Sequence, residues 1–365
     1  MKSLIGKIGK SIRRSSCTGR IRLESDQDNN ASSTTMASLI VPDVVPSPSQ
    51  DCQRLHKAFQ GWGTDEKEVI RVLGHRNASQ LKLIRDTYLH LYHDSLLDAL
   101  HSELSGDFGA KMMNGCVIKQ KAIIMWTTDP PERDAKLAND ALKKSKKGVN
   151  NLKIVIEIAC ATSPQHLMAV RRAYCSLYDC SLEEDILSHV SSLPLRKLLV
   201  GLVSSYRYDE EAVDLVTADS EASSLHEAIQ TKKLDEDHVL WILCTRNVHQ
   251  LRASFECYKK KYGNTIDKDI KSSGNGDLQN LVRVAVSCID LPEEHFAVVI
   301  KESVAGLGTD EDSLTRAIVA RAEIDMVRVK EQYHLLYKCS LEADVIDDTS
   351  GDYKDFLMTL LGKGI

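Results

Sequence analysis

Two short segments, each followed at the same distance by an acidic residue, contain the residue types needed to bind a hard cation. The sequence GWGT occupies positions 61–64 and precedes Glu103, and GLGT occupies positions 306–309 and precedes Asp348. Ca²⁺ takes roughly six to eight oxygen ligands and accepts main-chain carbonyls as well as carboxylates. Two glycines allow the backbone to bend until successive carbonyls converge, and a later carboxylate can complete the shell. Each segment is therefore a candidate calcium loop.

Each candidate loop offers a single carboxylate among mostly neutral carbonyl oxygens. Such a site carries little negative charge, so it should bind Ca²⁺ weakly by itself and leave coordination positions for phosphate oxygens. The expected behaviour is weak affinity in solution and tight affinity on an anionic membrane.

Both loops belong to an internal repeat. Shifted by 245 residues, positions 61–108 carry the same residue as positions 306–353 at fifteen of 48 sites. A Tyr-x-x-Leu-Tyr-x-x-Ser-Leu pattern starts at Tyr88, Tyr174 and Tyr333, with a weaker copy at Tyr258. Apolar residues in these copies fall on one helical face. The sequence predicts an all-α protein of four homologous multi-helix repeats, each too small to be stable alone.

Helix-start signals follow the first loop. Thr64 can cap a helix whose first turn contains Asp65 and Glu66, and Asn77 with Gln80 has the spacing of a reciprocal cap. We therefore expect several short helices in each repeat. The repeats are predicted to occupy residues 51–121, 122–204, 205–290 and 291–365, with the calcium loops in the first and the fourth.

The second and third repeats lack both parts of the candidate site. Positions 147–149 of the second repeat read Lys-Gly-Val, with His189 at the acid position, and the third has Lys232-Lys233 near the loop and Ser273 at the acid position. Loop and acid are lost together while the apolar pattern is kept. Two distant features that disappear together are expected to act together. This disfavours the alternative that each GxGT segment is only a glycine turn before a capped helix.

Residues 1–50 are predicted to be a basic, disordered N-terminal extension with a Pro/Ser lead. Residues 1–35 hold seven Lys and Arg against three acidic residues, although the whole chain has a net charge of −5. Leu4, Ile5, Ile8 and Ile12 would share one helical face, which is typical of a transit peptide or a membrane-surface helix. A disordered tail with a fortuitous apolar stripe is the alternative.

Composition excludes several classes of protein. The net charge of −5 gives no basic field for nucleic acid, and no stretch approaches the roughly 20 apolar residues that span a bilayer. The ten cysteines are scattered without a Cys-x-x-Cys pair, so we expect reduced thiols in a cytoplasmic protein rather than a zinc site or disulfides.

Four repeats of this length, GxGT loops with an acid some forty residues later, and DPPERDA at Asp129–Ala135 together resemble the annexin family. GWGT in the first repeat, intact loops only in repeats one and four, and the Pro-Ser-Pro lead are similar to its plant branch. The resemblance covers roughly Met36–Ile365. Residues 1–35 depart from the family, so an alternative start competes with a targeting peptide as their explanation.

The resemblance implies a curved disc of four five-helix repeats with Ca²⁺ as the cofactor, bridging its convex face to anionic phospholipids. Binding would be peripheral and reversible, at the plasma membrane or endomembranes when calcium rises, in membrane trafficking, calcium signalling or stress response. Trp62 and Leu307 would contact the membrane, although Trp62 could instead be partly buried against a neighbouring helix. The implied ligands are Gly61, Trp62, Gly63, Thr64 and Glu103 in the first repeat, and Gly306, Leu307, Gly308, Thr309 and Asp348 in the fourth.

The plant branch has also been linked to peroxidase-like activity at the position of His75 and to a sulfur cluster at those of Cys160 and Cys244. His75 follows an amphipathic helix without a haem-type partner pattern, and both cysteines have apolar neighbours, so we expect no enzyme and inert thiols. Val327-Arg328-Val329 departs conservatively from the family's actin signature, which leaves actin binding and self-association open. The alternative function is a membrane-associated peroxidase-like or calcium-conductance protein that calcium recruits.

Overall fold

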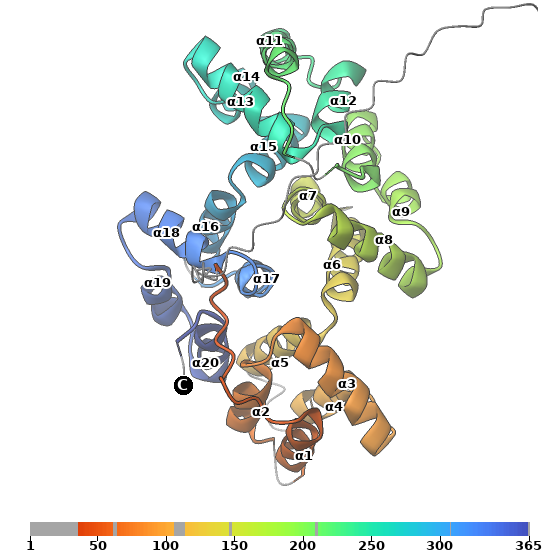
Figure 1. The fold of residues 1–365 in the computed structure, drawn as a ribbon, viewed down its shortest axis with the longest axis vertical. Helices are drawn as coiled ribbons and strands as arrows, with labels where there is room; N and C mark the ends of the chain where they lie inside the picture. The colour runs from red at the N-terminus through yellow and green to blue at the C-terminus, as the bar shows by residue number, and fades with distance from the viewer. Residues whose placement is uncertain are drawn as a thin grey trace, which may run out of the picture. The chain divides into compact units, whose positions relative to one another are not determined.

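Every regular element of the computed structural model is helical across the residues it describes, which are 36–60, 64–105, 114–145, 148–208, 211–306 and 308–363. The predicted amphipathic face at Leu4, Ile5, Ile8 and Ile12 lies outside these residues. Within the described ranges, the α-helices follow one another in four groups of five (Figure 1). The prediction of an all-α protein of four homologous repeats is confirmed.

The first two groups contain α1 to α10 and one short 3₁₀ helix. Their bounds are Pro48–Phe59 (α1), Glu66–Leu73 (α2), Ala78–Tyr92 (α3), Leu96–Ser105 (α4), Asn114–Thr127 (α5), Pro130–Ser145 (α6), Val149–Asn151 (η2), Leu152–Cys160 (α7), Pro164–Tyr178 (α8), Leu182–His189 (α9) and Leu193–Ser204 (α10).

The third and fourth groups contain α11 to α20. Their bounds are Leu215–Thr231 (α11), Asp237–Thr245 (α12), Val248–Tyr262 (α13), Ile266–Ser273 (α14), Asp277–Asp290 (α15), Pro292–Ser303 (α16), Glu311–Arg321 (α17), Met326–Tyr337 (α18), Leu341–Asp348 (α19) and Gly351–Leu360 (α20).

Side-chain caps start many of these helices. Asn77 caps α3 through the reciprocal pair with Gln80 that its spacing predicts, at 2.9 Å in both directions. The expected cap of α2 is wrong by one residue, because Asp65 rather than Thr64 accepts the bond from the Glu68 amide. The Thr64 hydroxyl points instead to α4.

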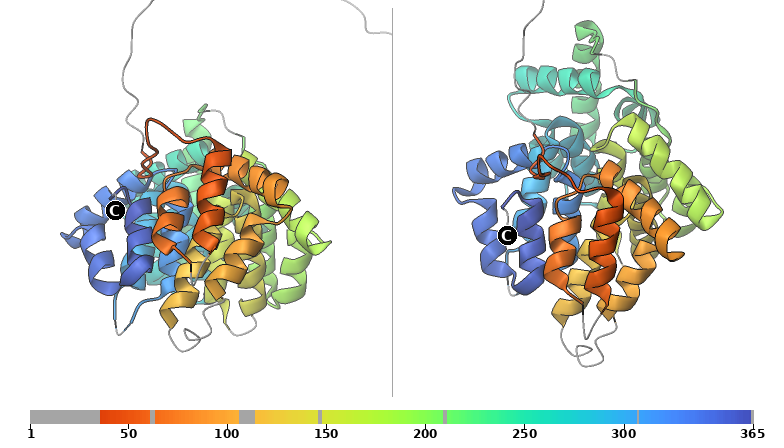
Figure 2. Two further views of the ribbon diagram at one scale, coloured as in Figure 1. Left: turned by 90° about the horizontal axis from the view of Figure 1, so that it is seen from below. Right: turned by 60° about the horizontal axis from the view of Figure 1, so that its bottom comes forward.

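The repeats share cores in pairs. One buried apolar cluster joins the first repeat to the fourth, and a second cluster joins repeats two and three. Helices α2 and α5 pack against α20, and α5 also packs against α17. In the left view of Figure 2 the blue helices of the fourth repeat stand beside the red and orange helices of the first. The two repeats that carry the candidate loops are therefore held together by one hydrophobic core.

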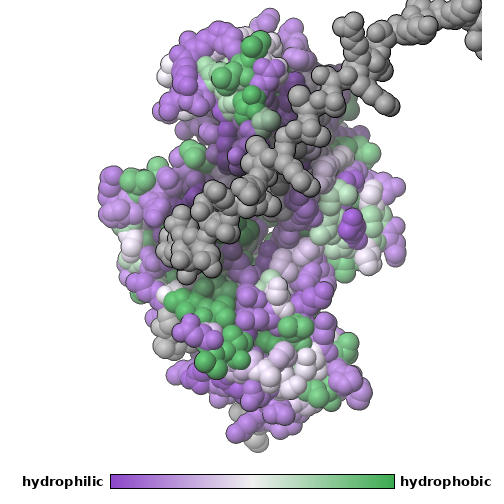
Figure 3. Space-filling model, in the orientation of Figure 1, coloured by the Kyte–Doolittle hydropathy of each residue, from purple (hydrophilic) through white to green (hydrophobic). Residues whose placement is uncertain are grey.

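The segment before α1 ties the first repeat to the fourth. The Ser38 amide donates to the Ala322 carbonyl at 2.9 Å, and the Ser38 hydroxyl donates to the Leu360 carbonyl at 2.6 Å. Ile40 and Val44 remain exposed, and the otherwise largely hydrophilic face in Figure 3 shows apolar surface along the course of this segment. Within the described residues, no helix is both long enough and apolar enough to span a bilayer.

Candidate calcium sites

The fourth-repeat loop connects α16 to α17 and bends at its two glycines. Gly306 has φ +128° and Gly308 has φ +95°, conformations that residues with a side chain rarely adopt. A Cβ at either position would meet no atom within 4 Å. Glycine is therefore required here by the backbone conformation and not by crowding. Leu307 lies outside the described residues.

Thr309 connects this loop to the distant acid. Asp348 is the last residue of α19 and is half-buried. The Thr309 hydroxyl lies 2.6 Å from Asp348 Oδ2 and 2.8 Å from the Asp348 carbonyl oxygen. The structure thus brings together Gly306, Gly308, Thr309 and Asp348, all four described members of the predicted site.

Gly61, Trp62 and Gly63 lie outside the described residues, but the residues on either side of them meet as their counterparts in the fourth repeat do. The Asp65 amide donates to the Ala58 carbonyl at 3.0 Å, and its counterpart in the fourth repeat, Asp310, donates to Ser303 at 2.8 Å. Thr64 approaches Glu103 on α4, with its hydroxyl 3.5 Å from the Glu103 carbonyl oxygen. The contact between Thr and acid therefore recurs, at a longer distance than in the fourth repeat.

The middle repeats place other residues at the acid position. α9 ends at His189 and α14 ends at Ser273, as α19 ends at Asp348. The His189 ring lies 3.0 Å from the Asp185 carbonyl, and the Ser273 hydroxyl donates to the Ile270 carbonyl at 2.8 Å. Neither residue supplies a carboxylate. His189 and Ser273 thus occupy the position of Asp348 at the end of the matching helix, but they cannot take its place as a calcium ligand.

The donor set of the two loops fits an oxygen-seeking cation. Across the described residues, no group of three or more His, Cys, Asp or Glu side chains is placed to hold a metal ion. The two predicted sites instead offer main-chain carbonyls with one carboxylate each, from Glu103 or Asp348. Such an all-oxygen set suits Ca²⁺, whereas thiolate or imidazole ligands suit softer metals.

A contact that the sequence analysis did not single out holds the acid-bearing helix of the fourth repeat. The Lys301 ammonium donates to Asp344 Oδ2 at 2.6 Å, and the hydroxyl of the buried Tyr333 donates to the same oxygen. Tyr174 and Tyr258 make the same bond, each to an Asp eleven residues later, at 2.6 and 2.8 Å. The recurrence of Asp eleven residues after this Tyr in three of four repeats was the available sequence signal.

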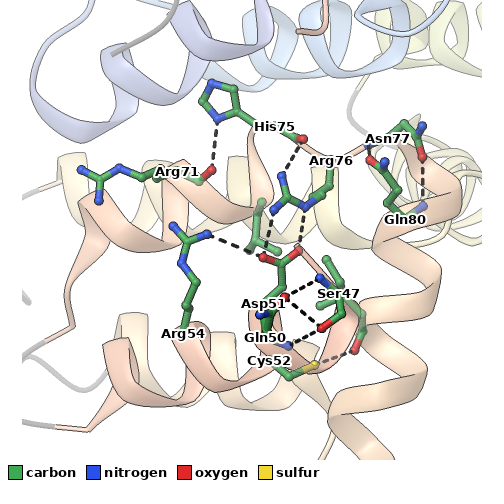
Figure 4. Close-up of polar contacts among 12 residues, drawn as sticks. Ser47, Gln50, Asp51, Cys52, Arg54, Arg71, His75, Arg76, Asn77 and Gln80 are labelled. Atoms are coloured by element: carbon green, nitrogen blue, oxygen red, sulfur yellow. Dashed lines mark hydrogen bonds and ion pairs between the residues drawn. The ribbon is translucent and has the colours of Figure 1, made fainter. Parts of the chain in front are cut away.

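The residues considered for redox chemistry have ordinary structural surroundings. Figure 4 shows His75 directed away from the buried Asp51–Arg76 ion pair, with its ring Nδ1 donating to the Arg71 carbonyl, 3.1 Å away. Partial burial, with smaller contributions from Arg76 and Arg71, lowers its pKa.

Cys160 and Cys244 are buried among apolar residues of repeats two and three. Burial raises the pKa of the Cys160 thiol to about 11 and that of Cys244 to about 12. Both thiols are therefore protonated at neutral pH, the unreactive form. All eight cysteines whose side chains the structure describes are free thiols.

Charged side chains line a cavity of about 380 Å³ between the second and fourth repeats. Glu157 is paired there with Arg316, and the His295 ring lies 3.0 Å from the other Glu157 oxygen. One terminal nitrogen of Arg316 is buried without a partner. The residues of this lining with ionisable side chains are Arg133, Asp134, Glu157, His166, Arg316, Arg321 and Glu323.

Comparisons with known proteins agree with this fold. A family model described as Annexin matches residues 50–114, 133–202, 220–284 and 295–360. Annexin D3 of Arabidopsis thaliana is 53% identical over 333 residues, which cover 90% of this chain and 100% of that protein. A solved structure described as annexin III has a TM-score of 0.77 at 31% identity, covering 89% of this chain and 97% of that chain. A calcium-bound annexin (Sm)1 structure has a TM-score of 0.72 at 25% identity, covering 92% and 99%.

Proposed function

Because the chain belongs to the annexin family, which implies calcium-dependent phospholipid binding, we propose that it attaches reversibly to anionic membranes through the loops of its first and fourth repeats. The contact between the Thr309 hydroxyl and the Asp348 carboxylate, at 2.6 Å, is the observation that carries this proposal. It joins the loop to the carboxylate of Asp348, which could complete an oxygen shell around a cation.

The residues of each loop have separate tasks in this proposal. Gly306 and Gly308 supply the positive φ angles at which the loop backbone bends, and Thr309 holds the Asp348 side chain beside the loop. Ca²⁺, when bound, would link these oxygens to phosphate oxygens of lipid headgroups. Trp62 and Leu307 are proposed to rest at headgroup level, where indole and aliphatic side chains are well accommodated.

The proposed cellular location is based on the state of the cysteines. The eight described free thiols suit a reducing compartment, so we place the protein in the cytoplasm, moving to the plasma membrane or endomembranes when calcium rises. Roles in trafficking, calcium signalling or stress response, and binding to actin or to a second copy, remain hypotheses. No enzymatic activity and no nucleic-acid partner are proposed.

Sedimentation with lipid vesicles tests the function itself. The protein is expected to pellet with phosphatidylserine vesicles in calcium, to be released by a chelator, and to stay in solution with phosphatidylcholine vesicles. Pelleting that ignores calcium, or no pelleting with phosphatidylserine at any calcium concentration, would contradict the proposal.

The charged cavity favours calcium conductance as a second candidate function. A conductance path needs charged residues on interior helix faces, and Asp134, Glu157 and Glu323 supply acidic groups there. Calcium influx into dye-loaded phosphatidylserine vesicles that Glu157→Gln reduces, at unchanged vesicle binding, would support this role. Absence of influx under conditions of full vesicle binding would exclude it.

A further inference from the structure

The helix that carries the fourth-repeat acid is fixed at two points one turn apart. Asp344 and Asp348 lie four residues apart on α19, and residues at this spacing share a helix face. Asp348 faces Thr309 of the loop. Asp344 faces Lys301 of α16 and Tyr333 of α18. One turn of α19 thus connects the candidate calcium ligand to two neighbouring helices.

The Asp344 contacts hold a charged carboxylate in place. Partial burial by itself would raise the pKa of Asp344, but hydrogen bonds from Lys301, Tyr333 and Cys339 together lower it. The Tyr333 hydroxyl has its pKa raised by burial and by this bond, so it remains a donor. Charge-assisted bonds of this kind are stronger than neutral ones. We call Lys301, Tyr333 and Asp344 the α19 clamp.

The first repeat has lost two of the three clamp residues. Under the 245-residue shift, Ala99 stands for Asp344 and His56 for Lys301, while Tyr88 is kept. The Tyr88 hydroxyl lies 3.4 Å from His56 Nδ1, and the His56 ring stacks on Tyr92 with centroids 3.9 Å apart. No carboxylate can connect α4 to α3 at this position.

The repeat with the complete clamp also has the closer contact between its loop threonine and its acid. The Thr309 hydroxyl lies 2.8 Å from the Asp348 carbonyl oxygen, whereas the Thr64 hydroxyl lies 3.5 Å from the Glu103 carbonyl oxygen. The Thr309 hydroxyl also lies 2.6 Å from the Asp348 carboxylate. Resting on the calcium-loop function proposed above, we propose that Tyr333 and Asp344 are positioning residues that preset Asp348 beside its loop. The fourth repeat is then the stronger of the two calcium sites.

The test compares two identical substitutions in a chain with only the fourth-repeat acid intact. In a Glu103→Gln background, Tyr333→Phe removes the clamp hydroxyl and is expected to raise the calcium needed for half-maximal binding to phosphatidylserine vesicles by about threefold or more. The matched control is Tyr174→Phe, which removes the equivalent bond to Asp185 in a repeat without a candidate loop. The control is expected to leave the calcium requirement unchanged.

A second measurement needs no calcium. Amide hydrogen exchange of the full chain in chelator should become faster in residues 341–348 when Tyr333→Phe or Asp344→Asn is introduced. The reciprocal design places the clamp in the first repeat. In an Asp348→Asn background, His56→Lys with Ala99→Asp should lower the calcium requirement for vesicle binding.

The outcomes separate the clamp from the function on which it rests. If Tyr333→Phe and Tyr174→Phe raise the calcium requirement equally, the effect is a general loss of rigidity and the clamp proposal is wrong. The proposal is also wrong if Tyr333→Phe changes neither the calcium requirement nor the amide hydrogen exchange of α19. If the Glu103→Gln parent fails to bind vesicles at any calcium concentration while the wild type binds, the fourth-repeat site itself is wrong and the clamp proposal falls with it.

Discussion

The hydroxyl of Thr309 lies 2.6 Å from the carboxylate of Asp348, a residue 39 positions later in the chain. This contact joins the start of one helix to the end of another on the edge of the fourth repeat. It places the only carboxylate of the predicted site beside two glycines with positive φ. The same pair in the first repeat, Thr64 and Glu103, approaches less closely.

Removing the Thr309 hydroxyl should weaken calcium binding without unfolding the protein. Thr309→Val keeps the shape of the side chain but loses a hydrogen bond that contributes about 1 kcal/mol, or roughly fivefold in affinity. Isothermal titration calorimetry with CaCl₂ in a Glu103→Gln background measures this loss of calcium affinity. Thr64→Val in an Asp348→Asn background is the comparison and should change affinity less, and a larger loss there would contradict the ranking of the two contacts.

Alanine at the second loop glycine should affect calcium more than stability. Gly308 has φ +95° with open space around it, so Gly308→Ala costs about 1 kcal/mol through backbone strain alone. Gly263 at the end of α13 has φ +81° and also has open space, so Gly263→Ala imposes similar strain far from either loop. Both variants should melt slightly earlier, and only Gly308→Ala should need more calcium to bind vesicles. If Gly308→Ala and Gly263→Ala needed the same calcium concentration to bind vesicles, the fourth-repeat loop would not be a calcium site.

Acidification should destabilise the protein through His295. Burial, with a smaller contribution from Lys153, lowers the pKa of His295 to about 4 from 6.5, and Arg316 already matches the charge of the neighbouring Glu157. Between pH 6.5 and pH 4, His295 is therefore protonated in the unfolded chain and neutral in the folded chain. This stability contribution is therefore complete above pH 6.5 and decreases as pH falls toward 4.

At pH 5 the loss should reach about 2 kcal/mol. Urea unfolding between pH 7 and pH 5, compared with His295→Gln, measures it, and the variant should show a flatter dependence on pH. The nearby Glu302 and Arg321 remain in both proteins, so they cancel in the comparison. Parallel pH profiles of the two proteins would refute this assignment.

The buried ion pair of the first repeat should be sensitive to the loss of either charge. Asp51 and Arg76 are both at most 2% exposed and are joined by two bonds of 2.7 and 2.9 Å (Figure 4). Asp51→Asn leaves an uncompensated buried guanidinium and should lower the free energy of unfolding by about 3 kcal/mol.

An exposed pair supplies the control for this prediction. Asp237 is 86% exposed beside Lys197, so Asp237→Asn should change the free energy of unfolding by no more than about 0.5 kcal/mol. Equal effects of Asp51→Asn and Asp237→Asn in urea unfolding would show that burial does not decide the contribution of the pair.

Much of the fold was predictable because the chain repeats itself. The recurring Tyr pattern at Tyr88, Tyr174, Tyr258 and Tyr333 marks buried helix faces, and the parallel loss of loop and acid in the middle repeats pairs two distant features. Contacts that cross repeats were not predictable. Nothing in the local sequence indicates that the first repeat shares a core with the fourth, or that Glu157 meets Arg316, because such pairing depends on how whole repeats pack.

The candidate site was predicted in its parts but not in its fine structure. Asp65 replaces Thr64 as the cap of α2 because the Thr64 hydroxyl is turned toward Glu103, and such competition between neighbouring side chains is visible only in three dimensions. Asp344 could have been found from its spacing to Tyr333, which Asp185 and Asp269 share relative to their own tyrosines. Its role next to Asp348 required the structure.

Co-sedimentation with phosphatidylserine vesicles across a calcium titration tests the central claim most directly. Wild type is compared with Glu103→Gln/Asp348→Gln, in which both loops keep their glycines but lose their carboxylates. Calcium-dependent pelleting of the wild type, with far more calcium needed by the double variant, is the predicted result. If both proteins pellet equally, or neither does, the pairing of loop and acid does not bind the membrane.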